Sequence, residues 1–443
     1  MKAILKYIYR TICGKLYSFE RRFAKEQQND MRYLDREIEK YALEINLPDF
    51  EDNIIDNRIA FLATELYDFG GHTEVIKNII ASLPQEYESK LFLAKKYRTF
   101  KCAPVKMMEI LQYCKADGVN FGYGNDKRSL QKIFEKIVEF APKAIFIFIH
   151  NNDVFSTALL SMLKNRTKIK VFYSDICSHQ FSIGMSFADL IMEAMPSTAF
   201  ITQKYRGFKN TVINGICYLP REKLPVIAEK SCGGTISGAA AYKFFENNDS
   251  PYLEMIERLL RKNENLRHTL ITEFTPRHKK IFDSIFKHSP AKNRIDIVKF
   301  TPNYKYLFKS ADVFIDSFPV SSAFTMIDLM SLNVPFVAKI NRENIAFSFH
   351  EYLTPGYPYM FENVRDMEAG IEELLSNKER RKQIAEKNFE YFLNFYEGKH
   401  YAGRLIDLVN CDDLSRVYCE QIEEEKYKNF KKMELLPFPF GLS

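Results

Sequence analysis

Short apolar runs alternate with amphipathic segments along the chain from about residue 57 onward. The run at 145–149 reads Ile-Phe-Ile-Phe-Ile, which is the pattern of a strand buried on both faces. Between such runs, apolar residues recur every three or four positions, as they do along the buried side of a helix. Regular alternation of strands and helices predicts parallel sheets covered by helices, which is an α/β fold.

Two series of these elements are separated by residues 215–232, an irregular stretch with two prolines that we interpret as a linker. The first series predicts strands at 58–64, 90–94, 144–149, 168–173 and 188–193, and helices at 74–83 and 128–140. The second predicts strands at 234–238, 268–272, 295–298, 313–316 and 335–338, and helices at 250–262, 277–287, 304–309 and 324–332. Charged helices at 377–397, 400–409 and 413–432 are expected to close the chain.

These elements predict two doubly wound, Rossmann-like domains that face each other across a cleft. We place the domains at 51–220 and 221–400, preceded by a basic amphipathic helical segment at 1–50 and followed by C-terminal helices at 401–443. Ligands of such sheets bind outside the carboxyl ends of the strands. Polar residues that directly follow a strand are therefore the first candidates for a functional site.

Composition narrows the class of protein. The 443 residues are 46% hydrophobic and 27% charged, which is enough for a large core and excludes whole-chain disorder. The longest apolar run is far short of the ~18 residues that a membrane-spanning helix needs. The eight cysteines form no Cys-x-x-Cys pair and have no His at zinc-finger spacing. With no secretory signal either, we expect them to be reduced thiols in a cytosolic protein.

The formal net charge of +6 is concentrated in the first 25 residues, which contain seven Lys or Arg and a single Glu. Apolar residues recur there at three- and four-residue steps, which predicts an amphipathic helix. Such a helix either binds an anionic membrane surface or packs its apolar stripe on the body of the protein. Nucleic acid is not favoured as a partner, because no basic patch interleaved with aromatics continues beyond residue 25.

The most informative stretch begins where a strand is predicted to end, at Asp316, and continues through a loop of small residues into a helix. The N–H groups and the dipole at a helix start favour a phosphate, to which Thr325 would add a hydroxyl. Asp328, one turn further along, can accept hydrogen bonds from ribose hydroxyls. Ser321 and Ser322 in the loop are either ligands of the same phosphates or ordinary capping residues.

Other candidates also follow predicted strands. His72 lies on a glycine-rich turn after the first strand, where it can act as an acid, a base or a hydrogen-bond donor. Lys243 follows the first strand of the second series and can neutralise a leaving diphosphate, although taken alone it reads as an ordinary surface lysine. His150, Asp175 and His179 are candidates to line the same cleft.

Several catalytic motifs are absent from the sequence. It has no Asp-x-Asp to clamp a metal ion on a diphosphate, no P-loop, no Gly-x-Gly-x-x-Gly and no Gly-x-Ser-x-Gly elbow. We therefore predict no metal site and no cofactor beyond a nucleotide co-substrate.

At these residues the sequence resembles glycosyltransferase family 41, which comprises the protein O-GlcNAc transferases and the bacterial adhesin N-glycosyltransferases and has the GT-B fold. The family's Asp-Phe-Gly-x-His matches Asp68 to His72, and its Tyr-Lys element matches Tyr242-Lys243. Its phosphate-loop run, with two Asp residues twelve positions apart and a following x-Pro-x-Val, matches residues 316–337.

The resemblance extends over about residues 57–340 and implies a metal-independent glycosyltransferase of the GT-B fold. Such an enzyme transfers a hexose or N-acetylhexosamine from a nucleotide sugar, here a UDP-sugar, to a protein or glycan acceptor. The first domain would lie on the acceptor side and the second would bind the donor. The resemblance places His72 at the acceptor and sugar, and Lys243 at the diphosphate leaving group. It implies that Thr325 binds a phosphate and Asp328 the ribose, with Tyr304 near the position that reads the base.

One element departs from the family, because its Gly-His-Thr-Thr is replaced here by the residues 322–325, Ser-Ala-Phe-Thr. Two alternatives stay open beside the leading interpretation. One is a transferase for capsule or lipooligosaccharide saccharides at the inner membrane face, which the basic segment at 1–25 favours. The other is a non-catalytic subunit that binds sugar nucleotides. In each case we expect a bacterial cytoplasmic protein, peripheral on the inner membrane if residues 1–25 bind it.

Overall fold

The computed structural model describes residues 31–66, 71–94, 110, 112, 119–121, 126–175, 180, 182–219, 234–246, 248–300, 304–322, 324–342, 351 and 355–428. They form two compact units. Unit 1 contains the described residues up to Tyr218 and, from the C-terminal part of the chain, Gly398–Tyr427. Unit 2 contains those from Leu219 to Glu397, together with Lys428. The amphipathic helix predicted at 1–25 lies outside the described residues.

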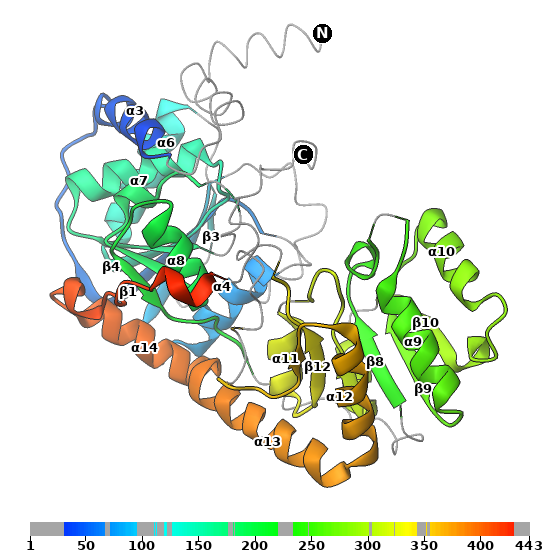
Figure 1. The fold of residues 1–443 in the computed structure, drawn as a ribbon. Helices are drawn as coiled ribbons and strands as arrows, with labels where there is room; N and C mark the ends of the chain where they lie inside the picture. The colour runs from blue at the N-terminus through cyan, green and yellow to red at the C-terminus, as the bar shows by residue number, and fades with distance from the viewer. Residues whose placement is uncertain are drawn as a thin grey trace, which may run out of the picture. The chain divides into compact units, whose positions relative to one another are not determined.

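Unit 1 is built on a parallel sheet of seven strands in the order β3-β2-β1-β4-β5-β6-β7. Strands β1, β3 and β4 of this sheet are labelled in Figure 1. In chain order these are β1 (Ile55–Ala63), β2 (Glu88–Leu93), β3 (Val119–Phe121), β4 (Pro142–Phe148), β5 (Lys170–Asp175), β6 (Leu190–Glu193) and β7 (Thr211–Ile213). The strand order reverses between β1 and β4, where Ala63 lies opposite Phe148. The carboxyl ends of β1 and β4 therefore lie side by side, at the edge where doubly wound sheets bind ligands.

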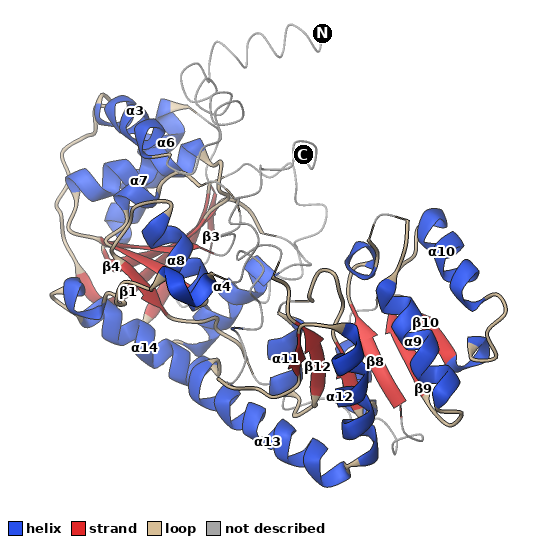
Figure 2. Ribbon diagram, in the orientation of Figure 1, coloured by secondary structure: helices blue, strands red, loops and turns tan. Residues whose placement is uncertain are grey.

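Helices pack on this sheet (Figure 2). They are α3 (Arg32–Leu43), α4 (Gly71–Ser82), α6 (Lys127–Phe140), α7 (Val154–Arg166), α8 (Pro196–Lys204) and α14 (Gly398–Asn410), with the 3-10 turn η1 (Met185–Phe187). Successive side chains of a strand point to opposite faces, so Ile145 and Ile147 share one apolar cluster with α3, α6 and α7. Between them Phe146 stacks on Phe61, with ring centroids 5.7 Å apart. From the far end of the sequence, α14 packs against α4.

Unit 2 repeats the same plan with a parallel sheet of six strands in the order β10-β9-β8-β11-β12-β13. The strands are β8 (Gly234–Gly238), β9 (Arg267–Ile271), β10 (Ile295–Val298), β11 (Val313–Ile315), β12 (Phe336–Lys339) and β13 (Met360–Phe361). The helices are α9 (Pro251–Lys262), α10 (Pro276–Phe286), α11 (Thr325–Ser331), α12 (Val364–Ser376) and α13 (Lys378–Phe395), with 3-10 turns η2 (Ala241–Phe244), η3 (Lys292–Arg294) and η4 (Tyr304–Ser310). Here the strand order reverses between β8 and β11.

The predicted α/β class with two Rossmann-like sheets is confirmed, and the predicted strands form with their ends shifted by a few residues at most. The pattern missed α7, because residues 154–163 of that helix are all buried and so show no amphipathic stripe. It missed α8 for the same reason, since the middle of that helix is also buried. Helices that lie wholly inside a protein carry little periodic signal.

The helix predicted at 413–432 is wrong over its described part. Only the 3-10 turns η7 (Leu414–Val417) and η8 (Glu424–Tyr427) form in those residues. Between the turns the backbone N–H of Cys419 donates to the Thr211 carbonyl at 2.7 Å, and that of Ile422 donates to Gln203 Oε1 at 3.1 Å. The segment is thus held against β7 and α8 of unit 1 by these hydrogen bonds. The division into units also differs from ours, because α14 belongs to unit 1 and the boundary follows Tyr218.

Candidate functional site

In unit 2 several predicted residues meet at the carboxyl ends of β8 and β11, where the strand order reverses. Strand β8 ends at Gly238 and leads into the turn η2, which carries Lys243. Strand β11 ends at Ile315, and Asp316 follows directly. In a doubly wound sheet this reversal point is where ligands bind, so the two loops form our main candidate site.

Lys243 reaches across from η2 to the loop that follows β11. Its Nζ donates a hydrogen bond to the Ser321 carbonyl oxygen at 2.7 Å. Burial lowers the pKa of Lys243, and the nearby Asp316 carboxylate opposes that shift. A lysine ammonium has three N–H donors, and among the described residues the Ser321 carbonyl is the one hydrogen-bond acceptor for them. The cation is therefore fixed in place with donors left to offer to a ligand.

Asp316 fastens the same loop to the end of the strand. Its side chain is fully buried, and Oδ1 accepts hydrogen bonds from both the backbone N–H of Ser322, at 3.0 Å, and the Ser322 hydroxyl. Burial raises the pKa of Asp316, while hydrogen bonds from Ser322 and from the Ser321 side chain, and the charge of Lys243, lower it. The structure thus gives Ser322 a role in holding the loop. Ser321 contributes its carbonyl oxygen to Lys243 and is itself buried.

The remaining predicted residues of unit 2 lie on α11 and η4. Helix α11 begins at Thr325, and the side chain of its N-cap residue, Phe324, makes no capping hydrogen bond. Thr325 is half-buried, whereas the Asp328 side chain is only 2% exposed. Tyr304 is the first residue of η4, and its side chain is outside the described part of the structure. Asp328 is thus more enclosed than a carboxylate that binds a ribose at an open surface would be.

In unit 1, His72 lies in the first turn of α4, next to the carboxyl end of β4. Its Nε2 lies 2.7 Å from the Phe148 carbonyl oxygen. Because a carbonyl only accepts hydrogen bonds, Nε2 carries the proton and Nδ1 has a bare lone pair. Burial lowers the pKa of His72 to about 4, and the neighbouring His150 pushes it in the same direction. His72 is therefore a neutral imidazole at pH 7 that can accept a proton or a hydrogen bond.

His150 and Glu65 stand beside His72 at the same edge of the sheet. The two imidazole rings are arranged edge to face with centroids 6.2 Å apart, and His150 Nε2 lies 3.7 Å from Glu65 Oε1. The backbone N–H of His150 donates to Thr64 Oγ1 at 2.8 Å, and the Thr64 hydroxyl donates to Asp153 at 2.5 Å. The sequence reasoning named His150 but missed Glu65, although Glu65 follows β1 almost directly.

Asp175 does not join this group, because it is enclosed in a separate buried cluster. It forms an ion pair with Arg206 at 2.5 Å and lies opposite Glu193 of the neighbouring strand. Glu193 is 1% exposed, and within the described ranges neither of its carboxyl oxygens has a partner at the usual hydrogen-bond distance and angle. Burial and the charge of Asp175 raise the pKa of Glu193 to about 8. His179 lies outside the described residues.

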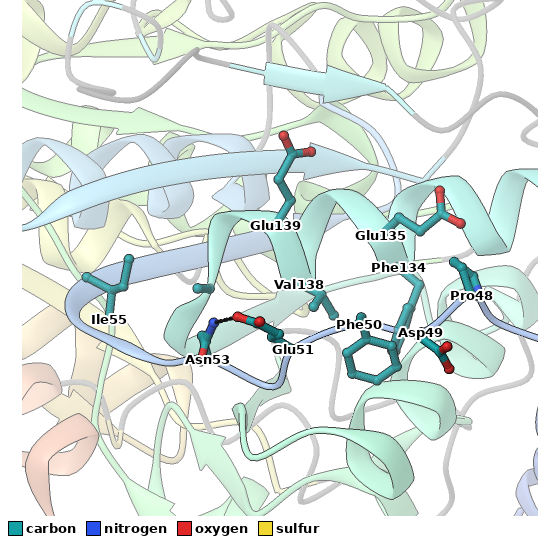
Figure 3. A pocket seen from close by; sticks show the side chains of 11 residues that line it. Pro48, Asp49, Phe50, Glu51, Asn53, Ile55, Phe134, Glu135, Val138 and Glu139 are labelled. Carbon is teal, nitrogen blue, oxygen red and sulfur yellow. Dashed lines mark hydrogen bonds between the residues drawn. The ribbon is translucent and has the colours of Figure 1, made fainter.

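A pocket of about 410 Å³ lies elsewhere on unit 1, between the loop before β1 and helix α6 (Figure 3). Its lining includes Ile55, where β1 begins, and Ala141, which directly precedes β4. The pocket is thus at the amino ends of the two strands whose carboxyl ends lie beside His72. Doubly wound sheets bind their ligands at the carboxyl ends, so we do not assign the pocket to the functional site.

No described helix is both long enough and apolar enough to cross a membrane. Nor do three or more His, Cys, Asp or Glu side chains in the described part gather closely enough to hold a metal ion.

No family model matches the sequence, and no curated protein does either. Solved structures match in fold. A point mutant of Thermobaculum terrenum O-GlcNAc transferase is similar with a TM-score of 0.55 at 11% identity, over 90% of this chain and 76% of that one. Anabaena HepE in complex with UDP has a TM-score of 0.59 at 12% identity, over 80% and 99% of the chains. A point mutant of S. aureus TarM, in complex with fondaparinux, α-GlcNAc-glycerol and UDP, has a TM-score of 0.58 at 8% identity, over 80% and 100% of the chains.

Identities this low establish the fold alone. This chain has the two-domain GT-B fold, with the Rossmann-like sheets of units 1 and 2 as its domains. Membership of family 41 stays a prediction, and so do the roles that the resemblance gave to individual residues.

Proposed function

We propose that this protein is a glycosyltransferase that uses a nucleotide sugar, with UDP as the nucleotide. The observation that carries the proposal is the hydrogen bond from Lys243 to the Ser321 carbonyl, at the strand-order reversal of unit 2. It brings a fixed cation to the loop that leads into the helix start where the sequence predicts a diphosphate. That HepE, of the same fold, is seen with UDP supports the choice of nucleotide.

Glycosyl transfer from such a donor breaks the bond between the sugar and the β-phosphate, so negative charge grows on the leaving diphosphate. Lys243 is positioned to stabilise this charge, and the hydroxyl of Thr325 to bind one of the phosphates. Well-placed donors of this kind contribute ~3–4 kcal/mol to transition-state stabilisation in other enzymes. Because a lysine supplies the positive charge, we propose a reaction that needs no metal ion. Asp328 is assigned to the ribose and Tyr304 to the surroundings of the base.

His72 is assigned to the acceptor side. Its neutral imidazole has a bare Nδ1, which can take a proton from an acceptor hydroxyl or amide, or orient a sugar hydroxyl. The hydrogen bond to Phe148 fixes the tautomer and the ring. We propose a protein or glycan acceptor and a hexosyl or N-acetylhexosaminyl group.

A thermal-shift screen of nucleoside diphosphates and their sugars, followed by an assay of nucleotide release, tests the proposal. A ligand at 100 times its dissociation constant should add ~2.7 kcal/mol to the stability of the folded protein. Stabilisation by UDP with release of UDP from a UDP-sugar supports a transferase. Stabilisation without turnover, on any acceptor offered, indicates the non-catalytic binding subunit instead. No stabilisation by any nucleoside diphosphate would refute the proposal.

The second candidate is a transferase that acts on a capsule or lipooligosaccharide saccharide at the inner membrane face. It is favoured by the charge of the first 25 residues, which contain seven Lys or Arg and a single Glu. Deleting residues 1–25 should release the protein from phosphatidylglycerol vesicles at low salt and leave its melting temperature unchanged. Full-length protein that does not bind such vesicles would exclude this membrane attachment.

A further inference from the structure

We propose that Tyr252 is a positioning residue, which sets the geometry of Lys243 and of the loop 316–322 through a chain of buried hydrogen bonds. This inference rests on the proposed function, since it concerns the same nucleotide site. Tyr252 is in the first turn of α9, is fully buried and is not itself a candidate to touch a ligand. No sequence motif singled it out.

The hydrogen bonds run through the core of unit 2 and end at the strand that carries the loop. Thr235 Oγ1 lies 2.9 Å from His268 Nδ1, and His268 Nε2 lies 3.3 Å from the Tyr252 hydroxyl. The Tyr252 hydroxyl makes a short hydrogen bond with Ser237 Oγ. Ser237 Oγ in turn donates to the Ile315 carbonyl oxygen at 2.6 Å. Ile315 is the last residue of β11 and directly precedes Asp316.

The proton positions along this chain follow from its last member. The Ile315 carbonyl only accepts, so Ser237 gives it its single proton and must accept from Tyr252. Because the Tyr252 hydroxyl donates its one proton to Ser237, it must accept a hydrogen bond from His268 Nε2–H. His268 Nδ1 is left unprotonated and accepts from Thr235. Burial lowers the pKa of His268 to about 3, in agreement with this neutral form. One donor direction therefore satisfies all four contacts.

The ring of Tyr252 contacts the two segments of the candidate site, the turn η2 and the loop 316–322. It lies against Phe244, the neighbour of Lys243, with ring centroids 4.7 Å apart. It meets Phe318, inside the loop that Asp316 fastens, edge to face at 5.4 Å. Tyr252 thus touches the two segments that the bond from Lys243 to Ser321 joins. A shift of its hydroxyl or ring would move both partners of that bond.

A buried polar chain of this kind costs more to desolvate than apolar packing would, so it is not explained by stability alone. Its effect is on geometry, because each hydroxyl and the imidazole can donate its hydrogen bond in only one direction. We infer that the chain fixes the end of β11, from which the loop 316–322 departs. The position of Lys243 then follows from the loop and from Phe244.

The test is Tyr252→Phe, which keeps the ring and removes the hydroxyl. Tyr357→Phe is the matched control, because Tyr357 is also buried in unit 2 and its hydroxyl donates to the Phe336 carbonyl at 2.7 Å. Phe336 is the first residue of β12, so this bond lies at the amino end of its strand and not at the carboxyl end, where the candidate site lies. We expect Tyr252→Phe to raise the Kd for UDP about 3- to 10-fold, the range for one hydrogen bond. The control should change it less than about 2-fold, which corresponds to less than about 0.4 kcal/mol.

Two readouts separate positioning from a general loss of stability. Hydrogen exchange of the 316–322 peptide in the nucleotide-free protein should be faster in Tyr252→Phe and unchanged in Tyr357→Phe. The double variant Lys243→Met/Tyr252→Phe should have nearly the kcat of Lys243→Met alone, because Tyr252 acts through Lys243. If Tyr252→Phe does not fold, Ser237→Ala breaks the chain at its last link and should give the same pattern.

The outcomes distinguish this inference from the proposed function. If wild-type protein binds UDP but Tyr252→Phe matches Tyr357→Phe in Kd, exchange and kcat, the inference is wrong and the proposed function stands. If kcat losses of Tyr252→Phe and Lys243→Met simply add, Tyr252 does not act through Lys243. If wild-type protein binds no nucleoside diphosphate, the proposed function fails, and the positioning role for a nucleotide fails with it.

Discussion

Replacing Lys243 by Met is the change that most directly tests the proposed chemistry. Met keeps most of the length and the apolar stem of Lys, so the packing beside Phe244 is retained while the charge is lost. Among the described residues Lys243 Nζ makes one hydrogen bond, to the Ser321 carbonyl at 2.7 Å. Lys243 is only half-buried, so water can replace the ammonium at that carbonyl. We expect the free energy of unfolding to change by less than about 1 kcal/mol.

The effect on turnover should be far larger, because the leaving diphosphate gains charge only as the bond to the sugar breaks. The cation is partly desolvated, as its lowered pKa indicates, so its field on a neighbouring phosphate is weakly screened. One preorganised donor of this type contributes ~3–4 kcal/mol, which corresponds to a fall in kcat of about 10²- to 10³-fold. The donor KM should change much less, by about 3-fold or less, because the ground state has less charge to stabilise.

The assay is release of UDP from a UDP-sugar at saturating acceptor, with kcat and KM determined separately. Lys262→Met is the matched control, because Lys262 is an exposed lysine of unit 2 that pairs with Glu372 at 2.6 Å. Surface pairs of this kind contribute little, so its kinetics should equal those of the wild type. A Lys243→Met enzyme with wild-type kcat would remove Lys243 from the reaction. A rise in KM with unchanged kcat would reassign it to ground-state binding.

Three further predictions concern other residues of the two units. Asp328→Ala should weaken UDP binding about 10- to 150-fold by removing a charged acceptor, as titration calorimetry would measure, and an unchanged Kd in a folded variant would exclude Asp328 from the site. His72→Ala should lower turnover in the release assay but leave the Kd for UDP within a few-fold, and equal losses in both would contradict its place on the acceptor side. Burial raises the pKa of Glu193 from 4.5 to about 8, so the folded protein keeps a proton that the unfolded chain releases near pH 4.5. Stability should therefore fall as the pH rises from about 4.5 to 8, and Glu193→Gln should flatten that fall in a series of melting temperatures; parallel curves for the two proteins would refute the assignment.

The sequence predicted the fold well for identifiable reasons, whereas the functional role of the unit 2 site stays a prediction. Buried strands read as short apolar runs, and residues that directly follow such strands could be named as candidates, which is how Lys243 and the loop after Asp316 were chosen. The adjacency of β8 and β11 required the structure. Periodicity indicates which face of a helix or strand a residue occupies, but it does not indicate which polar side chains contact one another in the core. The pair Asp175–Arg206 joins a strand to the end of a helix 31 residues later, and no spacing rule anticipates it. The chain from Thr235 to Ile315 draws on three strands and a helix, so it too required the structure.

The return of the chain to unit 1 at its C-terminal end bears on the order in which the protein can be completed during synthesis. Helix α4, which carries His72, packs against α14, and the side chain of Lys170 in β5 holds the carbonyls of Val409 and Cys411 at the end of that helix. A ribosome that has made residues 1–218 has therefore not yet made the helix that covers α4. Unit 2 leaves the ribosome before that helix does and can fold first. The edge of unit 1 that carries His72 and His150 is then completed last. Under the proposed function, a truncated chain would therefore contain the nucleotide site of unit 2 before the acceptor side of unit 1 is complete.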